Sequence, residues 1–269
     1  MELDIRGTKI TVSDDFMDPE LPNKMYFSHS QFGMYRRCAR QYEYRYIKNV
    51  KQPPGVAMTQ GSALHKGAEV THRHTIEHGT PLPVEEGVTS VADTFEDMSQ
   101  NIEDWGENLP GHVKDRTVAH FRIYHASATP LIRPKEVEYP FAVRVGNVPM
   151  TGFIDLIDEA QGIEVVSDLK FTGKKWVPQK LRYETQLTLY AHVTGIPRVR
   201  IDFLLDHKAG AKYDPVRSER TPNDTKILEE DLQITVDCIK RGVFPRCDPT
   251  EWVCNERFCG YYQQCRGPK

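Results

Sequence analysis

The sequence lacks any run of eighteen apolar residues and has almost no net charge, because its 269 residues carry 35 Lys and Arg against 38 Asp and Glu. A membrane-spanning helix needs about 20 apolar residues, so we expect no membrane span. The first residues contain no basic stretch followed by an apolar one, and we therefore expect a cytoplasmic, reducing location. Repeats and low-complexity segments are also missing, and a hydrophobic content of 39% excludes a disordered or fibrous chain.

The small net charge hides two segments of opposite sign. Residues 24–51 carry seven Lys and Arg and one acid, whereas residues 84–107 carry eight acids and neither Lys nor Arg. The basic segment has apolar residues at helical spacing and Ser30 near its start, which predicts a helix capped by that serine. Its arginines form either a solvated face beside a buried aromatic ridge or a surface that faces phosphates. Net charge therefore excludes a uniformly basic nucleic-acid binder, but not a local basic patch.

Periodicity divides the chain into a helical first half and a region of strands. A helix is predicted over 59–77, where His65, Glu69 and His72 share one face. From residue 135 the pattern alternates as in β-strands, and helices are predicted over 179–194 and 221–244. We expect one domain spanning 1–269, made of 26–80 (N-terminal helices with Cys38 and His65), 81–134 (helical insertion), 135–205 (strand-rich core), 221–244 (helix) and 245–269 (Cys-rich tail).

The most informative stretch is a predicted hairpin. A turn centred near residues 160–161 places Asp155 opposite Val166 and makes Asp155 and Asp168 diagonal neighbours, roughly 7–8 Å apart. Because side chains alternate along a strand, Asp155, Asp168 and Lys170 then project from one face. A slip of one residue would send the two carboxylates to opposite faces.

Two carboxylates on one face can converge on a hard cation such as Mg²⁺ or Mn²⁺. Such an ion lowers the pKa of bound water, and a neighbouring lysine can stabilise phosphate oxygens, as phosphodiester hydrolysis requires. The other interpretation is a surface ion pair between Asp168 and Lys170 on the wet face of an antiparallel sheet.

The order of these motifs resembles the PD-(D/E)XK nuclease superfamily, and within it the RecB-type branch. That branch combines a helical His, an Asp, an Asp/Glu-x-Lys triplet and a Gln-x-x-x-Tyr helix. Here the sequence has His65 in Gly-Ser-Ala-Leu-His, Asp155 in Gly-Phe-Ile-Asp, Asp168-Leu169-Lys170, and Gln186-Leu-Thr-Leu-Tyr190, after an opening Phe27-Ser-His-Ser-Gln31. The resemblance spans about residues 26–266.

The resemblance implies an α/β fold with a restriction-endonuclease-like core, in which helices flank a mixed central β-sheet. It also implies that Mg²⁺ or Mn²⁺ is held by His65, Asp155, Asp168 and the backbone carbonyl of Leu169. Lys170 would be the catalytic lysine. Gln186 and Tyr190 would position DNA or the active-site residues. From their charge rather than from the resemblance, we expect the 24–51 helix and Lys174-Lys175-Trp176 to contact backbone phosphates. Glu138, a further acid just before the hairpin, is expected near the site.

Three of the six cysteines, Cys254, Cys259 and Cys265, lie within twelve residues of the tail. A fourth thiolate would complete a metal site. The resemblance extends to the CRISPR-associated exonucleases and AddB-type nuclease domains that hold a 4Fe–4S cluster with one N-terminal and three C-terminal cysteines, and it implies Cys38 as the fourth ligand. Zinc bound by four thiolates is the chemical rival, and Cys247 can replace Cys38 in a local zinc site. Unrelated buried thiols are the remaining interpretation.

We therefore expect a Mg²⁺- or Mn²⁺-dependent deoxyribonuclease, an exonuclease that acts on single- or double-stranded DNA with ends. Recombination, repair, replication or viral DNA processing would be its setting, with possible protein partners there. Two alternatives stay open. One is a non-catalytic DNA-binding or scaffold protein that keeps the nuclease fold. The other is a zinc-stapled interaction module that contacts a partner through the acidic 84–107 segment.

Overall fold

The computed structural model describes residues 1–22, 26–160, 162–173, 176–207 and 210–267. The chain divides into two compact units. The sheet unit consists of residues 53–139 and 153–221, and the cysteine unit consists of residues 1–52, 140–152 and 222–269. The cysteine unit is so named because all six cysteines lie in it. Each unit is described by itself below.

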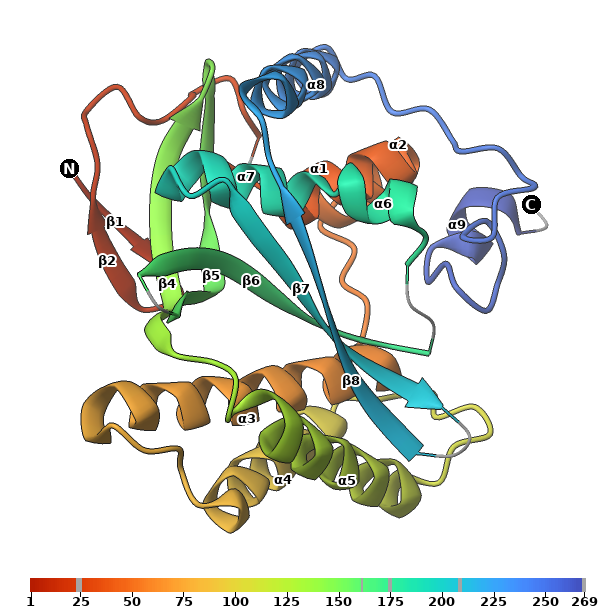
Figure 1. The fold of residues 1–269 in the computed structure, drawn as a ribbon. Helices are drawn as coiled ribbons and strands as arrows, with labels where there is room; N and C mark the ends of the chain where they lie inside the picture. Colours follow the sequence, from red (N-terminus) through yellow and green to blue (C-terminus); the bar gives the residue numbers. More distant parts are fainter. Residues whose placement is uncertain (23–25, 161, 174–175, 208–209, 268–269) are drawn as a thin grey trace. The chain divides into compact units, whose positions relative to one another are not determined.

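The sheet unit is built on a mixed β-sheet (Figure 1). Within it, residues 153–160 of β5 pair antiparallel with β6, β6 pairs parallel with β7, and β7 pairs antiparallel with β8. Strand β4 pairs with β5, and these two strands contribute residues to both units. The strands are β4 (Pro134–Val145), β5 (Val148–Ala160), β6 (Ile163–Thr172), β7 (Arg198–His207) and β8 (Gly210–Glu219).

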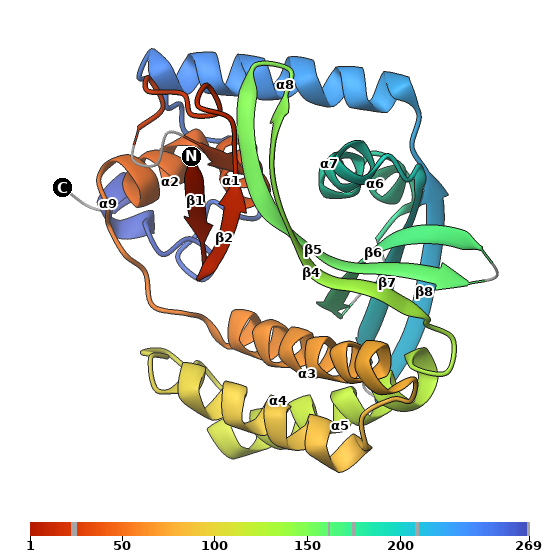
Figure 2. The same cartoon turned by 90° about the vertical axis from the view of Figure 1, so that its left-hand side faces the viewer.

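Helices cover both faces of this sheet. Figures 1 and 2 show α3, α4 and α5 packed against one another on one side, and α6 and α7 on the other. A buried phenylalanine, Phe121, fills the space between the three helices, where a Cβ at Gly67 would come within 2.7 Å of its ring. Glycine is therefore required for the close approach. The helices are α3 (Val56–His78), α4 (Val84–Ser99), α5 (Pro110–Ala128), α6 (Pro178–Arg182) and α7 (Thr185–Thr194).

The cysteine unit has an aromatic core, in which Phe27, Phe32 and Tyr42 are buried and the Tyr42 ring stacks on Phe244 at 6.1 Å. Strand β3 pairs parallel with β5 at Met150 and Thr151 of β5. The elements are β1 (Glu2–Ile5), β2 (Thr8–Thr11), β3 (Phe27–Ser28), α1 (His29–Arg37), α2 (Ala39–Tyr42), the π-helix η1 (Glu43–Ile47), α8 (Pro222–Lys240) and α9 (Tyr262–Arg266).

The mixed α/β architecture with flanking helices confirms the expected fold class, and α3 confirms the helix predicted over 59–77. Three details differ from expectation. The first helix is capped by Ser28 rather than Ser30, because a strand leads directly into it. The helix expected over 179–194 is two helices, since the chain leaves helical geometry at Tyr183 and Glu184. Strand β8 was not predicted at all.

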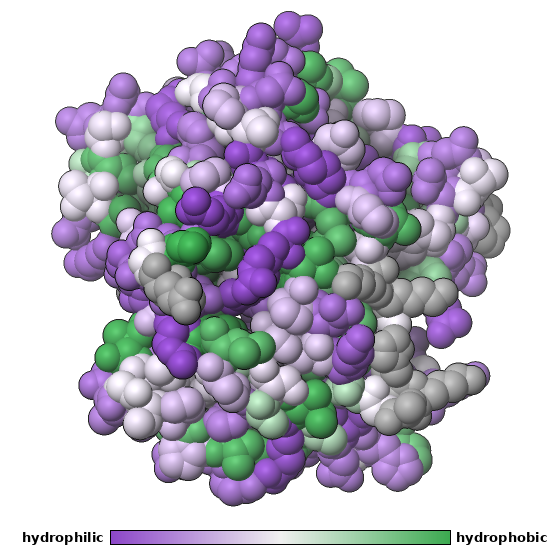
Figure 3. Space-filling model, in the orientation of Figure 1, coloured by the Kyte–Doolittle hydropathy of each residue, from purple (hydrophilic) through white to green (hydrophobic). Residues whose placement is uncertain are grey.

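Hydrophilic residues predominate on the face that Figure 3 shows, and hydrophobic residues form separate small groups there. Within the described residues, no helix combines the length and the apolar character needed to cross a bilayer.

Candidate active site

The β5–β6 hairpin of the sheet unit brings the predicted acidic residues together. The register pairs Ile157 with Val166 and Leu156 with Ser167, two residues away from the pairing that we expected. The paired register ends at Leu156 and Ser167; extended by one residue, it would place Asp155 level with Asp168 rather than diagonal to it. Because the difference is an even number of residues, both side chains still lie on one face of the sheet, as predicted.

Asp155 lies in a group of three possible metal ligands. One ligand atom each from His65 of α3, Glu138 of β4 and Asp155 of β5 lie within 4.8 Å of one another, and His65 Nδ1 is 3.2 Å from Asp155 Oδ2. Glu138 has a positive φ of 49°, which is uncommon for a residue other than glycine. Such strain is concentrated at functional sites, where the surrounding structure maintains it. The geometry therefore assigns Glu138 a more central position than the sequence did.

Asp168 of β6 is buried next to Lys170 instead. Lys170 Nζ lies 2.9 Å from Oδ1 of Asp168, in hydrogen-bond geometry, and 2.7 Å from Oδ2. The second contact is electrostatic only, because Asp168 Oδ2 is buried with no hydrogen-bond partner in the described part of the chain. This pairing rules out the alternative of an ion pair on a wet face, since the side chain of Asp168 is only 2% exposed.

A chain of hydrogen bonds holds Lys170 from its other side. Its ammonium donates to Gln186 Oε1 at 2.9 Å, the Gln186 amide donates to the Tyr190 hydroxyl at 2.8 Å, and that hydroxyl donates to the carbonyl of Phe153 at 2.8 Å. Gln186 and Tyr190 are one turn apart on α7, so they face the sheet together. In this structure they hold the lysine in position.

Electrostatics distinguish the two carboxylates. Burial alone would raise the pKa of Asp155, but the charge of His65 and a hydrogen bond from it lower the pKa overall. Burial raises the pKa of Asp168 to about 7, against the opposing charge of Lys170. Burial also lowers the pKa of His65, but the charge of Asp155, a hydrogen bond to it and the charge of Asp168 together raise that pKa to about 9. Asp155 is therefore the more strongly anionic carboxylate.

The residues present fit a divalent cation. Two carboxylates and an imidazole converge, which is a donor set that Mn²⁺ and Mg²⁺ sites use. Among the described residues, the buried Asp168 Oδ2 has an electrostatic contact with Lys170 but no hydrogen-bond partner, so it keeps the capacity to bind a cation. The hydrogen bond between Leu169 N and Asp155 Oδ2, at 3.2 Å, keeps the backbone of Leu169 beside this group. Its carbonyl as a ligand stays a prediction.

Two other residues of the His65 helix face have separate partners. Glu69 pairs with Lys66 at 2.9 Å and with Arg73 at 3.0 Å. His72 is buried and its Nε2 lies 2.8 Å from the Tyr124 hydroxyl. Burial lowers the pKa of His72 to about 4, so this histidine is neutral near pH 7. Neither residue belongs to the group of His65, Glu138 and Asp155.

A buried ionic network lies on the same sheet and was not foreseen from sequence. Arg200 donates to Asp158 at 2.5 Å and to Asp202 at 2.8 Å, and Tyr213 donates to Asp202 at 2.6 Å. Arg200 is 4% exposed, so the two carboxylates are needed to compensate its buried positive charge. Arg-x-Asp at alternate positions of a strand was the only available sequence signal, and it is common.

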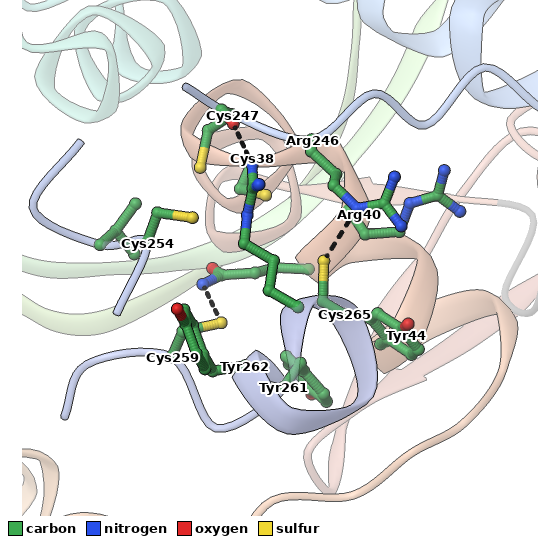
Figure 4. A pocket seen from close by; sticks show the side chains of 13 residues that line it. Cys38, Arg40, Tyr44, Arg246, Cys247, Cys254, Cys259, Tyr261, Tyr262 and Cys265 are labelled. Carbon is green, nitrogen blue, oxygen red and sulfur yellow. Dashed lines mark hydrogen bonds between the residues drawn. The ribbon is translucent and has the colours of Figure 1, made fainter. Parts of the chain in front are cut away.

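The cysteine unit contains the second predicted site. Cys38, Cys247, Cys254, Cys259 and Cys265 line one pocket, and Figure 4 shows their sulfurs around it. Gln41 Nε2 donates to Cys259 Sγ at 3.1 Å, and Arg246 Nε donates to Cys265 Sγ at 3.2 Å. The structure thus brings the four predicted ligands together with Cys247. Cys238, on α8, does not line the pocket.

The pocket fits an anionic thiolate cluster. The guanidinium nitrogens Arg40 Nε and Arg266 Nε are buried in it without a hydrogen-bond partner among the described residues. Burial raises the pKa of Cys38, but hydrogen bonds from the backbone N–H groups of Cys247, Gln41 and Arg40 lower it overall. By contrast, burial and the neighbouring thiols raise the pKa of Cys247 to about 12. Cys38 is therefore the better thiolate of the two.

The basic segment 24–51, which we expected to be one helix, contains α1, α2 and η1 and is partly neutralised by internal ion pairs. Arg36 pairs with Asp231 at 2.9 Å, Lys48 pairs with Glu43 at 3.1 Å, and Arg40 also pairs with Glu43. The acidic segment is partly paired too, because Glu85 binds Arg122 and Glu96 binds Lys114. Lys174 and Lys175, which we expected to contact phosphates, lie outside the described residues.

With this geometry in place, the comparisons with known proteins identify the family. A family model described as the PD-(D/E)XK nuclease superfamily matches residues 26–266, and the chain belongs to this superfamily. A solved structure from Eubacterium rectale, named "Putative exonuclease", is similar over 91% of this chain and 89% of its own chain, with 14% sequence identity and a TM-score of 0.57. That likeness concerns the fold.

A second solved structure, named SSO0001, covers 88% of this chain and 94% of its own, with 12% identity and a TM-score of 0.37. No curated protein matches the sequence.

Proposed function

We propose that the protein is a Mg²⁺- or Mn²⁺-dependent deoxyribonuclease of the RecB type, which hydrolyses phosphodiester bonds from a DNA end in the cytoplasm. The observation that carries the proposal is the convergence of His65, Glu138 and Asp155 within 4.8 Å beside the Asp168–Lys170 pair. Exonuclease action is also what the name of the Eubacterium rectale protein states for that protein.

In this proposal, each residue has a distinct role. His65, Asp155 and Asp168 hold the cation as the sequence suggests, together with the carbonyl of Leu169, and Glu138 is an added ligand. The cation, when bound, makes water more acidic and neutralises charge on the phosphate. Lys170 orients the attacking water and stabilises the negative phosphate oxygens with its ammonium group.

The lysine can perform this role because it is held on both sides. Asp168 and Gln186 accept two of its three hydrogen bonds, which leaves one N–H free of these two partners to face the phosphate. Lys170 is 27% exposed, so DNA can reach it. Tyr190 fixes the Gln186 amide, and through it the lysine. Gln186 and Tyr190 therefore act as positioning residues.

Degradation of end-labelled single- and double-stranded DNA in Mn²⁺ tests the proposal. We expect the wild-type protein to release nucleotides from an end and Lys170→Ala to bind DNA without cleaving it. Lys212→Ala is the matched control, because Lys212 is an exposed lysine of the same unit. Equal turnover by Lys170→Ala and the wild type would contradict the role assigned to Lys170. Binding without any cleavage by the wild type would favour the non-catalytic DNA-binding alternative.

We further propose that Cys38, Cys254, Cys259 and Cys265 hold a 4Fe–4S cluster rather than zinc. Zinc with Zn–S distances of about 2.3 Å needs four sulfurs in mutual contact. No three cysteines of the described chain place their sulfurs within 4.8 Å of one another, although five of them line the pocket. A larger cluster is the occupant that this wider spacing favours. The buried arginine nitrogens would balance its negative charge.

Anaerobic purification tests this part independently of nuclease activity. We expect brown protein that contains iron and acid-labile sulfide in about equal amounts. Colourless protein with stoichiometric zinc would contradict the iron–sulfur cluster. It would favour the alternative of a zinc-stapled interaction module.

A further inference from the structure

The short helix α6 and its flanks carry an aromatic and basic strip beside the candidate active site, in which Lys180 and Tyr183 are exposed and Trp176 and Arg182 are half-buried. We define the strip as Trp176, Lys180, Arg182 and Tyr183. Tyr183 is 67% exposed, and Arg182 Cζ lies 5.4 Å from the centre of its ring. Lys180 Nζ lies 3.8 Å from the centre of the Trp176 ring. Single exposed apolar residues are ordinary on proteins, but two aromatic rings that each contact a cation within eight residues form a distinct surface.

Two contacts anchor this strip to the catalytic side of the sheet. The Trp176 ring packs edge-on against Phe203, with centroids 5.6 Å apart, and Phe203 is the β7 residue paired with Lys170. Residues paired in a parallel ladder point to the same face of the sheet, so Trp176 lies on the face from which Lys170 projects. At the other end of the strip, the Glu184 carboxylate accepts from the backbone N–H of Gln186, the residue that binds Lys170.

The chemistry of the strip fits unpaired nucleotides. Every base has a flat face that can stack on an aromatic ring, and cations over or beside the ring can bind the adjoining phosphates. In an intact duplex the faces of the bases are covered by their neighbours, so an exposed tyrosine contacts only the sugar–phosphate edge. A surface of this kind therefore discriminates by strandedness, not by sequence.

We propose that the strip is a stacking platform that seats the unpaired bases of a single-stranded DNA end, with Tyr183 under a base and Lys180 and Arg182 on phosphates. The inference rests on the proposed nuclease function and specifies its substrate. Helix α6 directly precedes α7 (Figure 1), which carries the Gln186 that binds Lys170, so in this proposal the platform adjoins the residues that hold the lysine.

Fluorescence anisotropy with a labelled oligothymidylate, and with a blunt duplex of equal length, tests this proposal in EDTA. We expect Tyr183→Ala to weaken binding of the single strand about tenfold and to leave duplex binding unchanged. Tyr183→Phe keeps the ring and should bind within about twofold of the wild type. Leu131→Ala is the control, because Leu131 is 65% exposed in the same unit and should bind like the wild type.

Lys180→Ala supplies a second readout, since loss of a phosphate contact reduces the slope of affinity against salt concentration by about one. The proposal is overturned if Tyr183→Ala binds the single strand like the wild type, or loses single strand and duplex equally. These results leave the nuclease assignment untouched, because no cleavage occurs in EDTA. Conversely, the expected binding pattern without any Mn²⁺-dependent cleavage supports the platform and contradicts the nuclease.

Discussion

Gln186 Oε1 accepts a hydrogen bond from Lys170 Nζ at 2.9 Å, so the glutamine of the Gln-x-x-x-Tyr motif holds the lysine of the Asp-x-Lys motif. An amide has a fixed donor end and a fixed acceptor end, and here the donor end is bound to Tyr190. The acceptor end must then face the ammonium group. Lys170 and Gln186 are sixteen residues apart in the sequence, and this hydrogen bond joins their two motifs into one arrangement that holds the lysine.

Replacing Gln186 by leucine should separate positioning from substrate binding. The lysine would keep Asp168 but lose its second partner, and we expect kcat to fall roughly tenfold to a hundredfold with little change in KM. Steady-state kinetics on a labelled oligonucleotide measures both. Gln233→Leu, on α8 of the other unit, should leave both constants unchanged. A loss confined to KM would place Gln186 on the DNA instead.

Glu138→Gln tests the ligand that the sequence alone ranked low. Loss of one anionic donor should weaken Mn²⁺ binding at least about tenfold. Titration calorimetry of the protein without DNA measures this directly. Glu136→Gln is the matched control, because Glu136 is an exposed glutamate two residues earlier on the same strand. Equal affinity in both variants would remove Glu138 from the site.

Because His72 is buried and neutral, we expect the folded protein to become less stable in mild acid. Its pKa is lowered by burial from 6.5 to about 4, so the unfolded chain binds a proton more readily than the folded chain between these values. The free energy of unfolding should therefore fall as the pH falls through this window, by about 2 kcal/mol between pH 7 and pH 5. Urea unfolding at both pH values measures it, and His72→Gln should lack this part of the decrease. A decrease of the same size in both proteins would argue against a neutral buried histidine.

Arg200→Met should destabilise the sheet unit strongly. It would leave Asp158 and Asp202 buried without their shared cation, which costs about 3–5 kcal/mol. Arg198→Met, two residues earlier on β7, changes an exposed arginine whose nearest acid is 3.9 Å away and should cost less than about 0.5 kcal/mol. Thermal unfolding followed by circular dichroism distinguishes the two. Similar melting temperatures of the two variants would mean that the ionic network around Arg200 contributes little to the stability of the fold.

The cysteines can be tested one at a time by iron and sulfide content. Cys259→Ser should lose the cluster, because Cys259 is a buried member of the proposed quartet. Cys238→Ser should retain it, since Cys238 lies outside the pocket. Cys247→Ser should retain it as well, because Cys38 is the better thiolate of the two. If Cys247→Ser loses iron and Cys38→Ser keeps it, Cys247 rather than Cys38 is the fourth cluster ligand.

Sequence patterns were reliable where periodicity alone decided the outcome. The observed register of β5 and β6 differs by two residues from the one that we expected. The expectation that Asp155 and Asp168 share a face is unaffected, because only shifts by an odd number of residues exchange the faces. Strand β8 could not be predicted, since Pro215 and its charged neighbours resemble a loop, yet an edge strand tolerates proline. Glu138 and the Lys170–Gln186 contact depend on how separate elements meet. No local pattern encodes that, and only the family resemblance pointed to Gln186.

The division of the chain into interleaved segments has a consequence for how the protein can change. The proposed catalytic residues all lie in the sheet unit and the cysteines all lie in the cysteine unit, yet the first unit uses two separate stretches of chain and the second uses three. No single cut yields either unit whole, and excising residues 140–152 would open the β4–β5 hairpin that carries Glu138 and Asp155. Neither unit can therefore be removed, added or exchanged by a simple truncation or fusion of the chain.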